Sequence, residues 1–186
     1  MAEPVRIETD RLVLRDWRDG DAERFFAGTN TPPVMRWLGG VMDDAGRQAL
    51  LDRVSACRER NGFCFWIVER KADGEVLGFC GLKRADAPGS SVPGAMEVGW
   101  RLREDAWGQG YAKEAATASL DAAFTRFGAD EVVALTVLGN EPSWGLMERL
   151  GMRRRLDLDY IDTRFSPPLC DTIVYSITND AWTETE

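Results

Sequence analysis

The chain has 186 residues and a net charge of −8, a length typical of one domain and a charge that repels nucleic-acid phosphates. It contains no histidine, which excludes Ser-His-Asp and Cys-His catalysis and leaves acid–base chemistry to carboxylates, hydroxyls, thiols or lysine. Its apolar runs are shorter than the ~20 residues that span a bilayer, and its N-terminus lacks a basic, then apolar leader, so we expect a cytoplasmic protein that binds neither membrane nor nucleic acid.

The N-terminal third predicts a strand followed by helices. Residues 5–14 alternate in hydrophobicity and contain β-branched side chains, as a strand does. Asp19 or Asp21 is placed to cap a short helix that ends near Phe26. Apolar side chains then recur at helical spacing over 43–60, which predicts an amphipathic helix with Asp43 or Asp44 as its N-cap.

Strands dominate the middle of the chain. The dense apolar run 63–69 and the run 76–82 flank Ala72-Asp73-Gly74, which predicts a hairpin. A loop rich in Gly, Pro and Ser covers 86–94, and the sequence AMEVGWRL at 95–102 predicts a further strand.

The C-terminal part alternates between helix and strand. Small and apolar side chains fall at helical spacing over 110–127, and EVVALTVL at 131–138 is a β-branched strand. A short helix over 140–150 ends before Gly151 at the expected C-cap. The ranges 152–160 and 170–178 predict the last two strands.

This order predicts an α/β protein in which a mixed sheet is flanked by helices. The helix between 95–102 and 131–138 indicates a right-handed crossover, so these two strands should pair in parallel. Most other neighbours should be antiparallel, in a twisted sheet of about seven strands. We expect a single domain over 1–186.

The cysteines do not indicate a redox or metal site. The sequence has four, Cys57, Cys64, Cys80 and Cys170, and none forms a CxxC pair. Cys64 and Cys80 lie inside apolar runs, where a thiol packs as a small hydrophobic side chain. We expect neither a disulfide nor a bound metal.

The segment after the strand 95–102 is suited to bind an anion. Gly108 and Gly110 precede a predicted helix and allow unusual backbone angles. Backbone N–H groups of 108–112 can converge on an anion at the helix N-terminus, where the helix dipole adds attraction. The dinucleotide fingerprint GxGxxG and the P-loop are both absent. These residues alone leave a pyrophosphate site and a plain tight turn as alternatives.

Three motifs resemble the GNAT superfamily of N-acyltransferases. WGQGYAKEA at 107–115 is similar to its acyl-CoA loop, Gln/Arg-x-x-Gly-x-Gly/Ala, although Trp107 replaces the usual Gln or Arg. IETDRLVLRDWRDGDAERFF at 7–26 and NEPSWGLMERLGM at 140–152 look like the branch that resembles ribosomal-protein N-terminal acetyltransferases, of which Trp107 is also typical. The resemblance covers nearly the whole chain and implies a GNAT-like sheet, splayed where the strands 95–102 and 131–138 hold the acyl donor.

The resemblance implies acetyl-CoA as the co-substrate, without a metal. Its pantetheine arm should pair with backbone atoms of Trp100, Arg101 and Leu102. Its pyrophosphate should be held by the loop residues Trp107, Gly108, Gln109, Gly110, Tyr111 and Ala112. Asn140 matches an asparagine that contacts the donor, and it is equally suited to be a helix N-cap. Whether the acyl group is acetyl or larger stays open.

The resemblance also suggests catalytic residues. Glu97 lies in an apolar strand, where partial burial would raise its pKa toward that of a general base, and its alternative is a carboxylate on a solvated face. Met147 occupies the position at which many relatives have a tyrosine that acts as the general acid. Ser143 is therefore the candidate to replace that tyrosine, through a hydrogen bond to the leaving sulfur, and its alternative is a structural role as the N3 residue of its helix. A backbone N–H near Val98 is the implied donor to the oxyanion.

The acceptor is expected to be a primary amine. An α-amine has a pKa about 2.6 units below that of lysine, so its neutral form costs roughly 3.5 kcal/mol less, which favours a protein or peptide N-terminus. A small-molecule amine and a non-catalytic acyl-CoA sensor remain alternatives, and a homodimer is compatible with the sequence. Substrate contacts should come from residues 19–60 and 159–170, with Arg36, Trp37, Tyr160 and Phe165 as candidates.

Overall fold

A computed structural model describes residues 4–184. Its contacts divide the chain into two compact units. Unit 1 combines the chain up to Lys83 with Gly99–Ser119, and unit 2 combines Arg84–Val98 with the chain from Leu120 onward. The single domain over 1–186 stays a prediction. The described residues form nine strands, two more than predicted, because two of the predicted strands are each divided.

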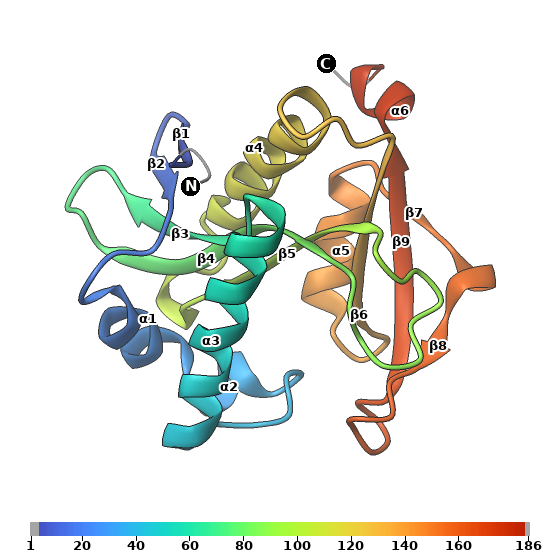
Figure 1. The fold of residues 1–186 in the computed structure, drawn as a ribbon, viewed down its shortest axis with the longest axis horizontal. Coiled ribbons are helices and arrows are strands. Elements are labelled where there is room, and N and C mark those ends of the chain that lie inside the picture. The colour runs from blue at the N-terminus through green and yellow to red at the C-terminus, as the bar shows by residue number, and fades with distance from the viewer. Residues whose placement is uncertain (1–3, 185–186) are drawn as a thin grey trace. The chain divides into compact units, whose positions relative to one another are not determined.

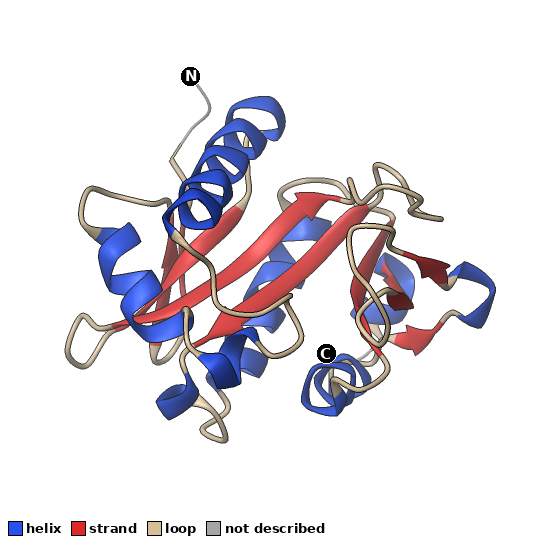
Figure 2. Cartoon of the chain, turned by 90° about the horizontal axis from the view of Figure 1, so that it is seen from below, coloured by secondary structure: helices blue, strands red, loops and turns tan. Residues whose placement is uncertain are grey.

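Unit 1 contains five neighbouring strands in the order β1-β2-β3-β4-β5, with helices on both sides of them (Figures 1 and 2). β1 to β4 pair antiparallel in succession. The strands are β1 (Arg6–Glu8), β2 (Leu12–Arg15), β3 (Phe65–Arg70), β4 (Val76–Arg84) and β5 (Met96–Leu102), of which β4 and β5 continue into unit 2. The helices are α1 (Asp21–Thr29), α2 (Pro32–Met35), α3 (Asp44–Asn61) and the first part of α4 (Tyr111–Thr125).

The single strand predicted over 5–14 is wrong. Thr9 turns the chain, because its hydroxyl accepts a hydrogen bond from the Leu12 N–H at 3.0 Å and its own N–H donates to the Leu12 carbonyl. β1 and β2 therefore form a hairpin. A short polar turn within an alternating run leaves the alternation intact, so the pattern alone did not reveal it.

The two predicted helix caps differ in outcome. Asp43 caps α3, and its carboxylate accepts a hydrogen bond from the Gly46 N–H at 2.8 Å. Gly20 occupies the N-cap of α1, so the prediction of Asp19 or Asp21 is wrong. The Asp21 carboxylate instead pairs with the buried guanidinium of Arg15 at 2.6 Å. An ion pair inside the fold thus takes the carboxylate that the local pattern assigned to the helix end.

The core of unit 1 packs α1 and α3 against the sheet. Phe25 stacks on Phe79, with ring centroids 5.2 Å apart, and Phe79 stacks on Phe65 at 4.5 Å. Around these rings the buried cluster includes Phe26, Leu50, Val54, Cys64, Ile67 and Val76. Cys64 and Cys80 are buried thiols, as predicted, and none of the four cysteines forms a disulfide within residues 4–184.

Unit 2 is built around β6 (Glu131–Val137) and β9 (Asp171–Thr178), which pair antiparallel along their whole length. The start of β5 pairs with β6 in parallel, as predicted, at Met96 opposite Val132 and Glu97 opposite Val133. The strand order is β5-β6-β9-β7, and β8 also pairs with β9. The other elements of this unit include α5 (Glu141–Arg149), α6 (Asn179–Thr183), β7 (Arg153–Arg154) and β8 (Tyr160–Ile161).

The strand predicted over 152–160 is also wrong. A 3-10 turn at Leu156–Leu158 separates β7 from β8. Arg154 and Arg155 form ion pairs with Asp159 and Asp157, which hold this turn in place. Charged side chains at close spacing thus favour a turn within an otherwise extended segment.

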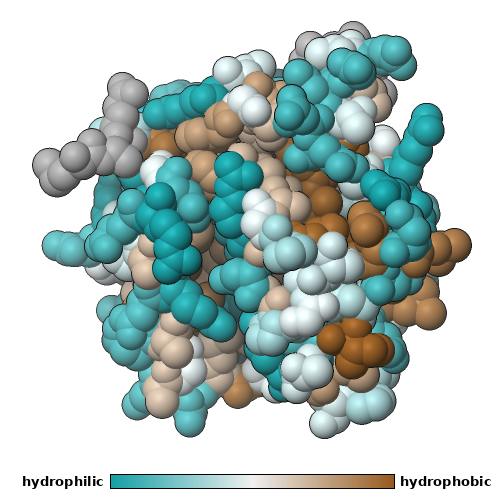
Figure 3. Space-filling view, turned by 45° about the vertical axis from the view of Figure 1, so that its right-hand side comes forward, coloured by the Kyte–Doolittle hydropathy of each residue, from teal (hydrophilic) through white to brown (hydrophobic). Residues whose placement is uncertain are grey.

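Within residues 4–184, no helix is both long enough and apolar enough to cross a bilayer. The face drawn in Figure 3 is mainly hydrophilic, with apolar side chains interspersed. Large hydrophobic side chains that are exposed include Leu138, Leu156 and Ile161.

Candidate active site

The predicted anion-binding loop lies in unit 1, between the end of β5 and the start of α4. A 3-10 turn at Glu104–Ala106 leads into it. The indole N–H of Trp107 donates to the Leu102 carbonyl at 2.9 Å, and the Gln109 side-chain amide donates to the Asp105 carbonyl at 2.7 Å. Both side chains therefore stabilise the loop by hydrogen bonds to backbone carbonyls just before it, a role that the sequence pattern did not predict for them.

The loop has the backbone geometry of an anion cradle. Gly108 and Gly110 have φ angles of 71° and 81°, in the left-handed region that other residues rarely adopt. A Cβ built on Gly108 would meet no atom within 4 Å, so the backbone there is open to an approaching group. The Gly110 carbonyl accepts the Glu114 N–H at 3.0 Å, the first hydrogen bond of the helix, and the N–H groups before it have no partner within a helix. These residues fit a pyrophosphate.

A clamp from the N-terminal hairpin holds this loop. The Glu114 carboxylate accepts hydrogen bonds from the Thr9 hydroxyl at 2.6 Å and from Arg11, whose Nε lies 2.7 Å away. Arg11 also donates from Nη1 to the Gln109 carbonyl at 2.9 Å, and its guanidinium lies 4.4 Å from the Tyr111 ring centroid. Burial would raise the pKa of Glu114, but these hydrogen bonds and the Arg11 charge hold it below its ordinary value.

The clamp was missed by sequence reasoning. Thr9 and Arg11 lie inside the motif at 7–26, and Glu114 lies inside the motif at 107–115, but the two partners are about a hundred positions apart. Because both motifs resemble those of one family, their joint presence was the available signal that the two segments contact each other in the fold.

The end of β5 forms the last strand of the unit 1 sheet, which suits it for backbone pairing with an extended ligand. Trp100 is half-buried, whereas the side chains of Arg101 and Leu102 are buried. The Leu102 carbonyl already accepts the Trp107 indole, so the predicted pairing there would use its second lone pair or neighbouring groups.

Glu97, the predicted base, lies in unit 2 and is only 8% exposed. The alternative of a carboxylate on a solvated face is therefore wrong. Tyr160 lies within electrostatic reach. Burial raises the pKa of Tyr160 and the charge of Glu97 raises it further, while the Ser90 and Thr172 hydroxyls partly offset this. Sequence reasoning named Tyr160 only as a substrate contact and missed this proximity.

Asn140 and Ser143 lie at the start of α5, in unit 2. Asn140 occupies the N-cap position, but its side chain makes no capping bond and donates instead to the Thr136 hydroxyl at 3.0 Å. Ser143 is the N3 residue and is half-buried. Met147 is 1% exposed, so an apolar side chain fills the position at which a tyrosine was expected in relatives.

The remaining predicted substrate contacts are distributed over both units. The Arg36 guanidinium lies 4.7 Å from the Trp37 ring, in unit 1. Phe165 is 37% exposed, in unit 2, and the Arg164 guanidinium lies 5.7 Å from its ring. Their role in substrate binding stays a prediction.

A model of the acetyltransferase (GNAT) domain matches residues 11–153. The chain therefore belongs to the GNAT acetyltransferase family, as its motifs predicted. GNAT acetyltransferases transfer an acyl group from acyl-CoA to an amine, so this chain is an acyltransferase.

Relatives agree in both sequence and fold. The Bacillus subtilis (strain 168) protein named uncharacterized N-acetyltransferase YoaA is 27% identical over 173 residues, 92% of this chain and 95% of the relative. An acetyltransferase of Agrobacterium tumefaciens str. C58 superposes with a TM-score of 0.77 at 24% identity, covering 94% of this chain and 95% of the other. The ribosomal-protein-S5-alanine acetyltransferase of Vibrio fischeri has a TM-score of 0.71 at 19% identity, covering 96% and 98%.

Proposed function

We propose that the chain transfers an acetyl group from acetyl-CoA to the α-amine at the N-terminus of a protein or peptide. The observation that carries the proposal is the clamped loop 107–112, in a chain of the GNAT family. Two points favour an α-amine. It is easier to deprotonate than a lysine, and one structural neighbour is named a ribosomal-protein-S5-alanine acetyltransferase.

The donor supplies a thioester, at whose carbonyl carbon a neutral amine forms the new C–N bond while the C–S bond breaks. Residues of this chain manage the protons and charges. Glu97 accepts the proton that the amine loses, directly or through a water. The Val98 N–H stabilises the developing oxyanion, and the Ser143 hydroxyl donates a hydrogen bond to the departing sulfur. A thiol pKa of about 8.5 means that the sulfur leaves with little acid assistance.

A thiol-release assay with acetyl-CoA and three matched acceptors tests the proposal. The acceptors are a short peptide with a free N-terminus and no lysine, a peptide with a blocked N-terminus and one lysine, and a small alkylamine. We expect amine-dependent thiol release to be fastest, by about tenfold or more, with the free N-terminus, because its neutral form is far more populated at neutral pH. Mass spectrometry should place the acetyl group on the α-amine.

Two results would contradict this assignment. Release with the alkylamine or the lysine peptide alone would move the acceptor to another class of amine. Tight binding of acetyl-CoA without any amine-dependent release would indicate a sensor.

The clamp on the loop yields a second expectation. Glu114→Gln should weaken acetyl-CoA binding by about tenfold, because the loop loses charge-assisted hydrogen bonds worth about 1.5–3 kcal/mol in ordering it. The pKa of Glu114 is lowered in the folded state. The stabilisation that its ionised carboxylate gives to the loop is therefore complete at neutral pH and is lost as pH falls through that lowered pKa. Calorimetric titration with acetyl-CoA measures the change.

Glu104→Gln is the matched control, because Glu104 is an exposed carboxylate in the 3-10 turn of the same loop. It should bind the donor as the wild type does. Equal affinities for wild type and Glu114→Gln would show that the clamp does not order the loop.

A further inference from the structure

Arg101 is a buried cation that lacks a carboxylate partner. Its residue is 9% exposed, and its Nε and Nη1 atoms have no hydrogen-bond partner among residues 4–184. A buried guanidinium without partners is costly, and native folds rarely keep one without a reason.

The other buried arginine of unit 1 shows the usual arrangement. Arg15 is 3% exposed, and Asp21 binds it through both carboxylate oxygens at 2.6 and 3.0 Å. Glu69 accepts two further hydrogen bonds from it, at 2.9 and 2.7 Å. The fold can therefore supply carboxylates to a buried arginine, and it does not do so at Arg101.

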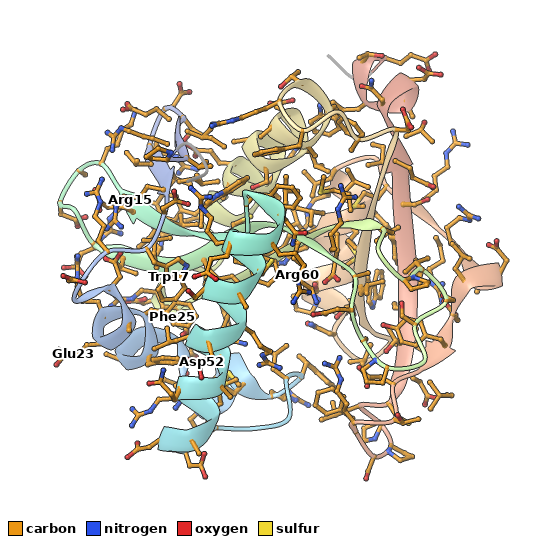
Figure 4. All side chains as sticks on the ribbon, viewed as in Figure 1. Arg15, Trp17, Glu23, Phe25, Asp52 and Arg60 are labelled. Carbon is orange, nitrogen blue, oxygen red and sulfur yellow. The ribbon has the colours of Figure 1, made fainter. Side chains whose placement is uncertain are left out.

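Aromatic rings hold the Arg101 guanidinium in place. Its Cζ lies 5.1 Å from the Phe79 ring centroid and 5.7 Å from that of Phe25, whose ring packs against Trp17 (both labelled in Figure 4). Stacked rings orient a guanidinium and leave its N–H edge to other partners. The aromatic contacts thus position a charge without neutralising it.

The charged neighbour of Arg101 has the same sign. Burial, with a smaller contribution from the charge of Arg53 on α3, lowers the pKa of Arg101 to about 10, so the guanidinium remains protonated at neutral pH. Two positive groups thus lie near each other in a chain whose net charge is −8. An oxyanion would satisfy the free N–H groups and relieve the repulsion.

We propose that Arg101 binds a carboxylate carried by the acceptor, so that the preferred substrate is an amine with a carboxylate close to it. Arg101 lies against α1 and near α3, the helices from which acceptor contacts are expected. The planar guanidinium can bind a carboxylate through two hydrogen bonds, which neutral acceptors cannot replace. The inference rests on the proposed acetylation of an α-amine and specifies which class of amine is the preferred acceptor.

Paired acceptors that differ only in the carboxylate test this. Alanine with alaninamide tests an α-carboxylate, and the dipeptide amides Ala-Asp and Ala-Asn test a side-chain carboxylate beside an N-terminal amine. For each pair we compare the ratio of kcat/KM for the carboxylate acceptor to kcat/KM for the neutral one. For at least one pair this ratio should be about 10–100-fold higher in wild type than in Arg101→Gln. Comparing each ratio between wild type and variant cancels differences in amine basicity. Arg18→Gln, a change at an exposed arginine, should keep the wild-type ratio.

A second readout does not depend on turnover. Arg101→Met removes a buried charge without a partner, so it should raise Tm by about 2–4 °C, whereas a structural arginine would lower Tm on replacement. At least one of the two carboxylate acceptors, alanine or the Ala-Asp amide, should also raise the Tm of wild type and leave that of Arg101→Gln unchanged.

The outcomes separate the two proposals. If the ratio of kcat/KM for the carboxylate acceptor to kcat/KM for its neutral partner is the same in wild type and Arg101→Gln for both pairs, the carboxylate site is refuted and the α-amine activity stands. If the variant loses instead a preference for succinyl-CoA over acetyl-CoA, the carboxylate belongs to the donor and the acceptor assignment falls. No thiol release with any amine refutes the proposed function, and the ligand-induced Tm shift then decides on Arg101 alone.

Discussion

Glu97→Gln is expected to lower kcat/KM for the acceptor amine by about 10²–10⁴-fold, the usual contribution of a positioned general base. Glutamine keeps the size and shape of the buried side chain but cannot accept a proton. The loss should be largest at low pH, where the acceptor is almost entirely an ammonium ion. It should shrink as pH rises, because free amine then reaches the thioester without help. Thiol-release kinetics between about pH 6 and pH 9.5 measure this dependence.

Three controls make the result specific to proton transfer. Acetyl-CoA affinity should be unchanged in Glu97→Gln, because the donor is expected to bind through backbone atoms and the loop. Glu97→Asp should recover part of the rate, since it restores a carboxylate. Tyr160→Phe removes the phenol within electrostatic reach of Glu97, and a loss as large as that of Glu97→Gln would move the proton-transfer role to Tyr160. A near-wild-type rate for Glu97→Gln across this pH range would remove Glu97 from the mechanism.

The sequence predicted those elements whose signal is local and long. The helical period over 43–60 corresponds to α3, and the β-branched run at 131–138 corresponds to β6. The parallel pairing of β5 with β6 followed from the helix between them, because a crossover through a helix returns the chain to the sheet in the same direction. Short elements failed where a side chain bonded across the turn, as Thr9 does in the hairpin of β1 and β2.

The sequence predicted the glycine loop of the candidate site but not the side-chain contacts that hold this loop and the end of β5 in place. Gly108 and Gly110 are visible in the sequence because no other residue tolerates their backbone angles well. The contact of Arg11 with Glu114 and the burial of Arg101 depend on which segments the fold brings together. A periodicity analysis assigns each residue to a face but not to a partner. The sequence therefore predicted a role for the backbone of Arg101 only, whereas the structure shows a buried side chain whose Nε and Nη1 have no hydrogen-bond partner among residues 4–184.

Gly78→Ala is expected to lower the free energy of unfolding by about 3–5 kcal/mol, through backbone strain combined with overpacking. Gly78 has a φ of 147°, which side chains rarely tolerate. A Cβ there would lie 2.0 Å from the Arg101 carbonyl oxygen and 2.8 Å from the Leu102 Cα. Both obstacles are backbone atoms of β5, so no side-chain rotation can relieve the clash, and one strand must move away from the other.

Gly74→Ala is the matched control, because Gly74 also has a positive φ, 72°, but a Cβ on it would meet no atom within 4 Å. This variant should lose only the strain term, about 1–2 kcal/mol. Denaturant titration of both variants separates strain from steric exclusion. Equal losses would mean that β4 and β5 adjust to the added methyl group. If the expected difference is found, acetyl-CoA affinity of folded Gly78→Ala should also fall, because the displaced backbone is that of Arg101 and Leu102, which is predicted to pair with the donor.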